Sequence, residues 1–229
     1  MYFMKKNKNK SKKSLLYAVI GLGRFGFALA KSLSQKGFDV IAIDRDRQKI
    51  NAAAEFTQSA FVIDELTVDN LRETGISEAD VAMVCIGSKL DVSVLTTMNV
   101  IKLGVPKVIS KATSEEQGEI LRLLGAEVVY PEHDMAIRLA TRLASPNVIE
   151  YISLSDEIDI AEIKLSKKIE GKTVLELNVR RNFGLNIIAI TEEGKMTTDI
   201  MPDTVLSAEN TVTVIGKTVN IKKFEEYLG

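Results

Sequence analysis

The chain has 229 residues, of which 45% are hydrophobic and 27% are charged, so it can bury one large or two small hydrophobic cores. Its single cysteine, Cys85, excludes an internal disulfide framework, and its single histidine excludes a metal site built from several histidines. Cys85 lies in an apolar run and is predicted to be a reduced core residue. The formal net charge of −1 includes six lysines within residues 5–13, and without them the remainder carries −7.

Residues 1–14 are predicted to be a disordered basic tail. Its role is either solubility or attraction to an anionic membrane surface, where each lysine contributes about 1 kcal/mol. A secretory signal is rejected, because Arg24 interrupts the apolar run that follows the lysines. No run reaches the roughly 18 apolar residues that a membrane-spanning helix needs.

Short apolar segments rich in β-branched residues follow the tail. They begin at Tyr17, Asp39, Ser59, Asp80, Pro106 and Ala126. Continuous hydrophobicity is typical of strands that are covered on both faces. Helical patterns lie between them, at residues 25–35, 47–56, 68–74, 91–103 and 115–124. This alternation predicts an α/β fold, a Rossmann-like doubly wound parallel sheet.

A further helix is predicted at residues 134–143, with apolar residues on more than one face. These residues are Met135, Ile137, Leu139, Ala140 and Leu143. We expect this helix to cross between subunits and to hold a dimer. Ser145 and Pro146 mark the predicted end of a first domain, residues 15–145.

From residue 148 the pattern changes to shorter alternating strands with turns at "EEGK" and "SAEN". A helix is predicted at residues 219–228. Residues 148–229 are therefore predicted to form a smaller α+β domain.

A nucleotide site is predicted at the first strand, where the loop "GLGRFG" leads into a helix. Gly21 makes the tight turn, Gly23 lets the backbone approach a phosphate, and Gly26 lets the helix pack on the strand. The helix N-terminus offers unpaired N–H groups to an anion. Asp44 ends the second strand, where an acid can bind ribose hydroxyls, and it disfavours a 2′-phosphate despite Arg45 beside it.

Two further acids lie at strand ends. Asp64 ends the third strand and either contacts the adenosine or belongs to a helix N-cap. Asp80 starts the fourth strand at the far edge and is predicted to be a solvated turn residue. No acid/base group suited to hydride transfer follows from the pattern, since the only histidine is not near a strand end in the first half. We therefore expect binding without catalysis, with an NAD-dependent oxidoreductase as the alternative.

Several separate motifs carry a resemblance to one family. They are "GLGRFG", "AID", "VID", "IGS", "ISKA", "LLGAEVVYPEHDMAIRLA" and "LNVRRNFGLNIIAI". Together they resemble the KtrA/TrkA-type regulatory subunits of potassium uptake systems, which carry an N-terminal and a C-terminal RCK domain. The resemblance implies dimers that assemble into an octameric ring, cytoplasmic and peripheral at the inner face of the membrane. It also implies a KtrB- or TrkH-type channel subunit as partner and no nucleic acid.

The resemblance assigns ATP or ADP to the glycine loop, with NAD(H) as the TrkA-like alternative. It implies that Arg24 reaches the terminal phosphate of ATP, through charge-assisted hydrogen bonds, and that the neighbouring loop residues Phe25 and Gly87 adjoin the nucleotide. Lys111 would add positive charge near the phosphates, or else be an exposed lysine. Glu132 would bind a divalent cation such as Mg²⁺ together with the nucleotide, or else be a first-turn acid of a helix.

The C-terminal domain of the family resembles a receptor for cyclic di-AMP. Arg180 matches the residue that meets its phosphates, and Asn186 lies in the matching "GLNI" stretch. The apolar positions around the adenines are matched by Val174, Val179 and Pro202. Two positions depart from the pattern, because Asn178 replaces a common aspartate and Leu185 replaces a histidine found in some binders. The alternative is a domain that only dimerises.

Overall fold

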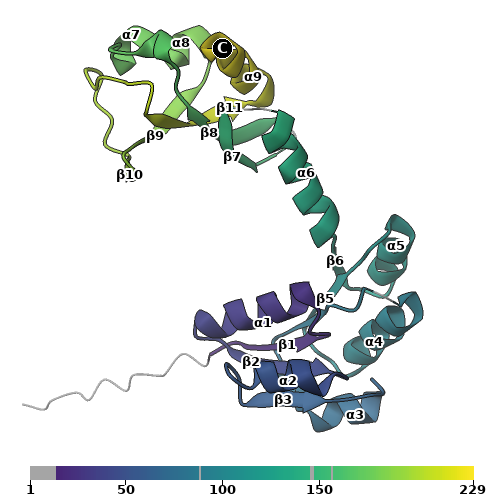
Figure 1. Ribbon diagram of the computed structural model, residues 1–229. Coiled ribbons are helices and arrows are strands. Elements are labelled where there is room, and N and C mark those ends of the chain that lie inside the picture. Colours follow the sequence, from purple (N-terminus) through teal and green to yellow (C-terminus); the bar gives the residue numbers. More distant parts are fainter. Residues whose placement is uncertain (1–13, 88, 145–146, 156) are drawn as a thin grey trace, which may run out of the picture. The chain divides into compact units, whose positions relative to one another are not determined.

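The computed structural model describes residues 14–87, 89–144, 147–155 and 157–229 (Figure 1). It contains two compact units, Met1–Glu132 and His133–Gly229. The sequence-based boundary at residues 145–148 stays a prediction, and Ser145 and Pro146 lie outside the described residues, as do residues 1–13 of the basic tail. None of the helices in the described ranges is long and apolar enough to span a bilayer.

The first unit is built on a parallel six-stranded sheet in the order β3-β2-β1-β4-β5-β6. The strands are β1 (Leu16–Ile20), β2 (Asp39–Asp44), β3 (Ser59–Val62), β4 (Val81–Val84), β5 (Lys107–Lys111) and β6 (Glu127–Val129). This confirms the predicted Rossmann-like doubly wound sheet. Strand order reverses between β1 and β4, and ligands of such sheets bind beside this switch point.

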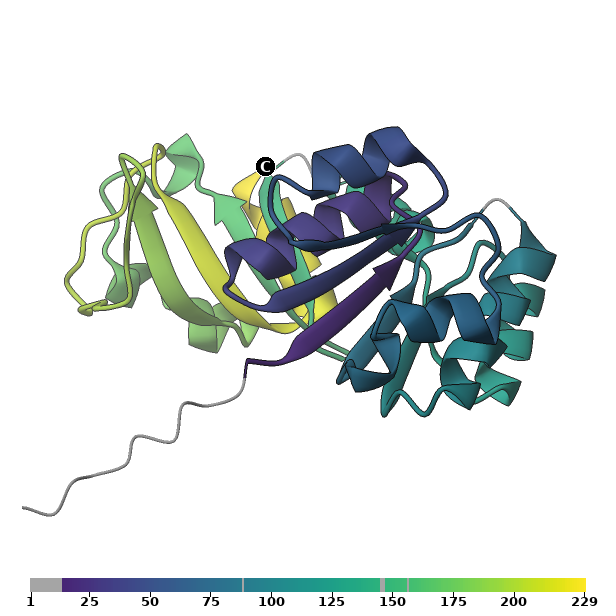
Figure 2. The same ribbon diagram turned by 90° about the horizontal axis from the view of Figure 1, so that it is seen from below.

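Helices cover both faces of the sheet. They are α1 (Arg24–Gln35), α2 (Arg47–Ala53), α3 (Val68–Glu73), α4 (Leu90–Lys102) and α5 (Glu115–Leu123). Helices α1 and α2 lie on one face of the sheet, and α3 and α4 lie on the other (Figure 2). Residues of α1 and α2 share one hydrophobic core with the sheet, and residues of α3 and α4 share another. The two cores explain the continuous hydrophobicity of β1, β2 and β4. The predicted helix at residues 47–56 is too long, since α2 ends at Ala53.

Helix α6 (Pro131–Ala144) starts three residues before the predicted helix at 134–143. Proline is favoured in the first turn of a helix, where its missing N–H would be unpaired in any case. Most of α6 belongs to the second unit, because the division between the units falls after Glu132.

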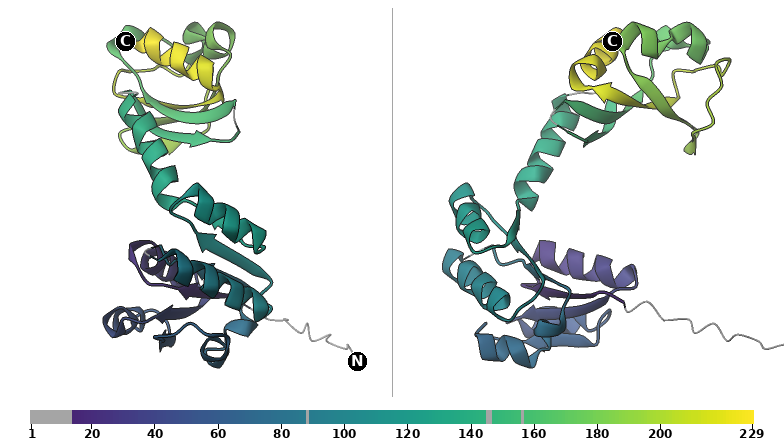
Figure 3. Two further views of the ribbon diagram at one scale, coloured as in Figure 1. Left: turned by 90° about the vertical axis from the view of Figure 1, so that its right-hand side faces the viewer. Right: turned by 180° about the vertical axis from the view of Figure 1, so that it is seen from behind.

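The second unit contains an antiparallel five-stranded sheet in the order β10-β9-β11-β8-β7. Its strands are β7 (Val148–Ser153), β8 (Ile158–Lys164), β9 (Asn186–Glu192), β10 (Lys195–Thr197) and β11 (Thr211–Lys217). Helix α9 (Thr218–Leu228) lies beside this sheet (Figure 3). Its residues Ile221 and Phe224 belong to the core of this unit. The smaller α+β fold is therefore as predicted. Strand β7 and the short helices α7 (Val174–Leu177) and α8 (Val179–Phe183) were not predicted.

A buried acid connects β7 and α9 in the second unit. Asp159 of β8 is 2% exposed, and its Oδ2 accepts hydrogen bonds from the hydroxyls of Tyr151 in β7 and Thr218 in α9. Burial, followed by the bond to Asp159, raises the pKa of Tyr151 to about 12. The tyrosine is therefore a stable hydrogen-bond donor to this carboxylate at neutral pH.

Candidate functional site

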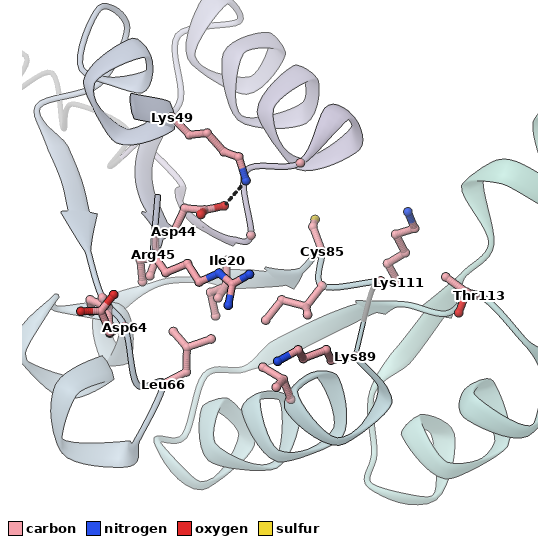
Figure 4. A pocket seen from close by; sticks show the side chains of 17 residues that line it. Ile20, Asp44, Arg45, Lys49, Asp64, Leu66, Cys85, Lys89, Lys111 and Thr113 are labelled. Carbon is pink, nitrogen blue, oxygen red and sulfur yellow. Dashed lines mark hydrogen bonds and ion pairs between the residues drawn. The ribbon is translucent and has the colours of Figure 1, made fainter. Parts of the chain in front are cut away.

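A cleft of ≈ 630 Å³ opens at the carboxyl ends of the central parallel strands of the first unit (Figure 4). Predicted site residues that line it are Gly21, Gly23, Asp44, Asp64, Gly87 and Lys111. They come from β1, β2, β3, β4, β5 and the loops after them, so the parallel sheet brings together residues far apart in sequence. Arg24, Phe25, Gly26 and Glu132 are not among the lining residues.

Each of the three glycines in the loop is favoured at its position for a different steric reason. Gly21 has a φ of +92°, which side-chain-bearing residues rarely adopt. A Cβ on Gly26 would lie 2.0 Å from the carbonyl oxygen of Gly21, so this helix can pack here only with glycine. A Cβ on Gly23 would meet nothing within 4 Å. The surface at Gly23 is therefore free for a ligand to approach the backbone at the start of α1.

Asp44 is buried beneath this loop. Its Oδ2 accepts a hydrogen bond of 2.6 Å from the backbone N–H of Leu22, and its Oδ1 accepts one of 2.9 Å from that of Asp46. Lys49 lies 3.4 Å from Oδ2 (Figure 4). A carboxylate has about four acceptor positions, so Asp44 can brace the glycine loop and still accept from a ribose hydroxyl.

Positive charge gathers around the cleft. The cleft is lined by Lys49, Arg45 and Lys89 in addition to Lys111, and none of these three was predicted as a site residue. The signal for Arg45 and Lys49 was their position directly after β2, next to Asp44. Arg24 is exposed at the first position of α1, and its side chain makes no hydrogen bond or ion pair with any residue that the structure describes.

Lys111 and Glu132 form an ion pair at one end of the cleft. The side chain of Lys111 is only 12% exposed, so the alternative of an exposed lysine is wrong, whereas that of Glu132 is 68% exposed. The hydrogen bond from Lys111 is the main reason that the pKa of Glu132 is lowered. No group of three or more acids, cysteines or histidines in the described ranges can hold a metal ion. Glu132 alone suits a cation that takes its other ligands from phosphate and water.

The structure excludes one of the two interpretations of Asp64 and changes that of Asp80. The N-cap of α3 is Thr67, whose side chain accepts from the N–H of Asn70, so Asp64 is not the cap. Asp80 is not merely solvated, because its Oδ2 accepts a 2.8 Å hydrogen bond from the N–H of Leu16 and fixes the start of β1. His133 is exposed.

Cys85 is buried and free, and it also lines the cleft, which the sequence did not reveal. Burial raises its pKa to about 12, although Lys111 acts in the opposite direction. The thiol therefore stays protonated at neutral pH. Phe25 of α1 is half-buried and packs against the core on the same side of the sheet.

The residues predicted to bind a ligand in the second unit differ in their exposure. Arg180, Asn186 and Pro202 are exposed, and Val174 is half-buried. Val179, by contrast, is buried in the hydrophobic core, and its contact with an adenine stays a prediction. The two residues that depart from the family pattern, Asn178 and Leu185, both have structural roles in this unit.

Asn178 ends α7 with a left-handed backbone (φ 41°), which asparagine tolerates well, and its side chain caps α8. Leu185 is fully buried. Backbone hydrogen bonds from Val174 to Thr204 and from Leu175 to Pro202 hold the loop before β11 against α7. The sequence did not indicate the exposed apolar residues that lie along these two segments, which are Leu175, Met201 and Val205.

Helix α6 carries the predicted apolar residues on its surface. Met135, Ile137, Leu139 and Leu143 are between 43% and 72% exposed. The predicted role of the helix in a dimer stays a prediction.

Two family models match this chain: the TrkA-N domain at residues 17–131 and the TrkA-C domain at residues 160–229. Ktr system potassium uptake protein C of Bacillus subtilis (strain 168) is 36% identical over 211 residues, 92% of this chain and 96% of that protein. Ktr system potassium uptake protein A of the same organism is 33% identical over 214 residues, with shares of 93% and 96%.

Among solved structures, a chain of the GsuK channel has a TM-score of 0.65 at 21% identity, over 96% of this chain and 40% of that chain. A second solved structure, the GsuK channel bound to NAD, has a TM-score of 0.61 at 20% identity, over 96% of this chain and 40% of that chain. These likenesses show the shared fold. The domain and sequence matches place the chain in the family of Ktr and TrkA potassium uptake proteins, the RCK-type regulators that combine a TrkA-N with a TrkA-C domain.

Proposed function

We propose that this regulator binds ATP or ADP in the cleft of the first unit and thereby opens or closes a membrane potassium channel subunit of the KtrB or TrkH type. One observation carries the proposal: the accessible backbone at Gly23, the buried carboxylate of Asp44 and the ammonium of Lys111 line one cleft at the switch point of the sheet. A helix N-terminus and a nearby cation suit phosphates, and a buried acid suits ribose hydroxyls.

Arg24 supports discrimination between ATP and ADP. It is exposed beside the cleft and has no partner among the described residues, so its guanidinium is available for the terminal phosphate. Glu132 would hold a divalent cation such as Mg²⁺ at that phosphate, in exchange for its present bond to Lys111. Each nucleotide can change the gate only by the difference in its affinity for the two states of the regulator.

Assembly follows from the same proposal. The exposed apolar residues of α6 support a dimer, and four such dimers would build the octameric ring. The ring would lie in the cytoplasm against the inner face of the membrane. Light scattering on the full chain tests the dimer, and a strict monomer at tens of micromolar would contradict it.

Calorimetry of the full chain with ATP, ADP, NADH and NADPH tests the ligand. Arg24→Ala should weaken ATP more than ADP, because only ATP has the terminal phosphate. Arg47→Ala is a matched control, since Arg47 is exposed at the first position of α2 and does not line the cleft. Equal losses for both nucleotides would show that Arg24 is no phosphate sensor. Tight NADH binding without ATP binding would favour the NAD(H)-sensing alternative, and hydride transfer to a carbonyl substrate would contradict a regulator without catalysis.

A second ligand, cyclic di-AMP, is proposed for the second unit, across a two-fold interface. The supporting observation is Arg180, which is exposed and has no side-chain partner among the described residues. Arg180→Ala should abolish binding of cyclic di-AMP to the full chain and leave ATP binding intact. Arg181→Ala, at the adjacent exposed arginine, is the control. If the unchanged protein binds no cyclic di-AMP, the second unit serves dimerisation alone.

A further inference from the structure

Lys111 and Thr113 line the cleft (Figure 4), and a set of buried polar side chains adjoins them. Ser93 and Thr97 of α4 and Ser110 of β5 are fully buried, and Gln117 of α5 is 4% exposed. Buried polar groups are costly unless they are hydrogen-bonded.

The backbone fixes the orientation of Gln117. The N–H of Thr113 donates to Oε1 of Gln117 at 2.9 Å, so this atom must be the amide oxygen. The hydroxyl of Thr113, 3.0 Å from the same oxygen, must then be a donor. On the other side, Nε2 of Gln117 donates to Oγ of Ser93 at 3.1 Å. Gln117 thus connects a loop that borders the cleft to the buried face of α4.

Ordinary helix capping does not account for this arrangement. The sequence from Ser114 to Gln117 has the form of a capping box, and the N–H of Gln117 does donate to the Ser114 hydroxyl. In such a box the glutamine side chain would return to the N–H of the cap residue itself. Here it binds Thr113, one residue earlier, which lines the cleft.

The consequence for the cleft is a fixed side chain at Thr113. With its hydroxyl held by Gln117, the residue turns its methyl group toward Gly87: a Cβ on Gly87 would lie 3.3 Å from that methyl and 3.4 Å from Nζ of Lys111. The Gly87 backbone, the Thr113 methyl and the Lys111 ammonium therefore meet at one point of the cleft wall.

We propose that Gln117 is a positioning residue of the nucleotide site, which holds the loop after β5 so that Lys111 and Thr113 face the phosphates. The inference rests on the proposed nucleotide binding in this cleft. Gln117 touches no ligand itself, and it acts through Thr113. A core position needs only a side chain of suitable shape, whereas this role needs an acceptor for the N–H of Thr113.

The test compares Gln117→Met with Thr97→Val in the full chain. The first variant keeps the approximate volume but removes the acceptor for Thr113. The second removes an equally buried hydroxyl, which pairs with Ser110 at 2.8 Å and does not line the cleft. Calorimetry with ATP, thermal unfolding and hydrogen exchange of the peptide that contains Thr113 are measured on both variants.

We expect Gln117→Met to weaken the binding of ATP about tenfold, which is the loss that follows from one missing hydrogen bond. Hydrogen exchange at Thr113 should become faster. Thr97→Val should lower stability to a similar extent but leave the ATP affinity unchanged. Unchanged ATP binding by Gln117→Met, or equal weakening by both variants, would overturn the inference. If unchanged protein binds neither ATP nor ADP, the proposed function fails and this inference with it.

Thr113→Val is a second variant in case Gln117→Met does not fold. It keeps the methyl group and the backbone N–H but removes the hydroxyl that donates to Gln117. An affinity for ATP that is a few-fold weaker supports the positioning role, and an affinity equal to that of the unchanged protein contradicts it.

Discussion

Lys111 at the end of β5 and Glu132 in the first turn of α6 are bonded to each other, although they are 21 residues apart in sequence. The lysine lines the cleft, and the acid lies next to the point where the chain enters the second unit. A phosphate in the cleft would compete with Glu132 for the same ammonium. Nucleotide binding would then act directly on the first turn of α6.

The first prediction concerns the acidity of Glu132. Because the bond from Lys111 is the main cause of its lowered pKa, Lys111→Met should return that pKa toward the ordinary value of 4.5. The stabilisation from a lowered pKa is present above the ordinary value and is lost as the pH falls through the folded-state value. The variant should therefore lose less stability on acidification. Carboxyl NMR titration and unfolding at several pH values measure both effects.

Lys107→Met is the control, because Lys107 pairs with Glu127 on the surface at 2.8 Å. It should leave the titration of Glu132 unchanged. An unchanged Glu132 titration in Lys111→Met would show that the ion pair does not control this carboxyl.

The second prediction separates two glycines of one loop. Gly26→Ala should prevent folding or cost several kcal/mol, because its Cβ would clash with the backbone oxygen of Gly21. Gly23→Ala should cost only about 1 kcal/mol or less, as expected for alanine at a helix N-cap. It should nevertheless abolish ATP binding, since the methyl group occupies the surface where the phosphate approaches. Full ATP affinity in a folded Gly23→Ala variant would argue against phosphate binding at this loop.

The third prediction concerns Asp44. The two carboxylate oxygens of Asp44 accept from the backbone N–H groups of Leu22 and Asp46. In Asp44→Asn only one of these oxygens remains, and the new NH₂ group faces the second N–H group. We expect a loss of about 1 to 3 kcal/mol in the free energy of unfolding and an equal weakening of ATP and ADP, which share the ribose. Asp64→Asn, in the same cleft but exposed, should leave stability unchanged. A strong preference for one nucleotide would contradict a ribose role.

The fourth prediction corrects a variant that the family pattern suggests. The family pattern favours histidine at position 185 as a ligand contact, but Leu185 is fully buried, and its side chain packs against Gly216. Leu185→His should therefore lower stability by about 2 to 5 kcal/mol, through the lost packing and the buried polar ring. Thermal unfolding measures the loss, and a stable variant that binds cyclic di-AMP more tightly would refute it. Asn178→Asp keeps the helix cap and is the safer substitution.

The sequence was sufficient for the parallel sheet and for the glycine loop with Asp44, because both depend on local patterns. Strands that are buried on both faces read as continuous apolar runs, and the loop has a fixed spacing. Strand β7 escaped prediction because Glu150 interrupts its apolar residues and most of the strand is exposed, so that neither a continuous apolar run nor a clear alternation marks it. Helices α7 and α8, of four and five residues, are too short to show a helical period.

Contacts between residues far apart in the chain could not be predicted from the sequence. The burial of Val179 is set by how α8 packs on the core, and four or five residues do not define an inner face. The bond from Lys111 to Glu132 depends on β5 lying beside β6, which places the start of α6 near the end of β5. Likewise, the role of Gln117 appears only when α4, β5 and α5 are assembled.

The buried carboxylate of Asp159 has a practical consequence for dividing the protein. The TrkA-C match begins at residue 160, so a fragment cut at that boundary would lose both Asp159 and the strand that carries Tyr151. A fragment that starts at Asp159 would keep the charge but lose one of its two hydroxyl donors, and a deletion of α9 would remove the other. A buried carboxylate that has lost its hydrogen-bond donors is expensive. Fragments of the second unit should therefore begin before Val148 and extend through α9.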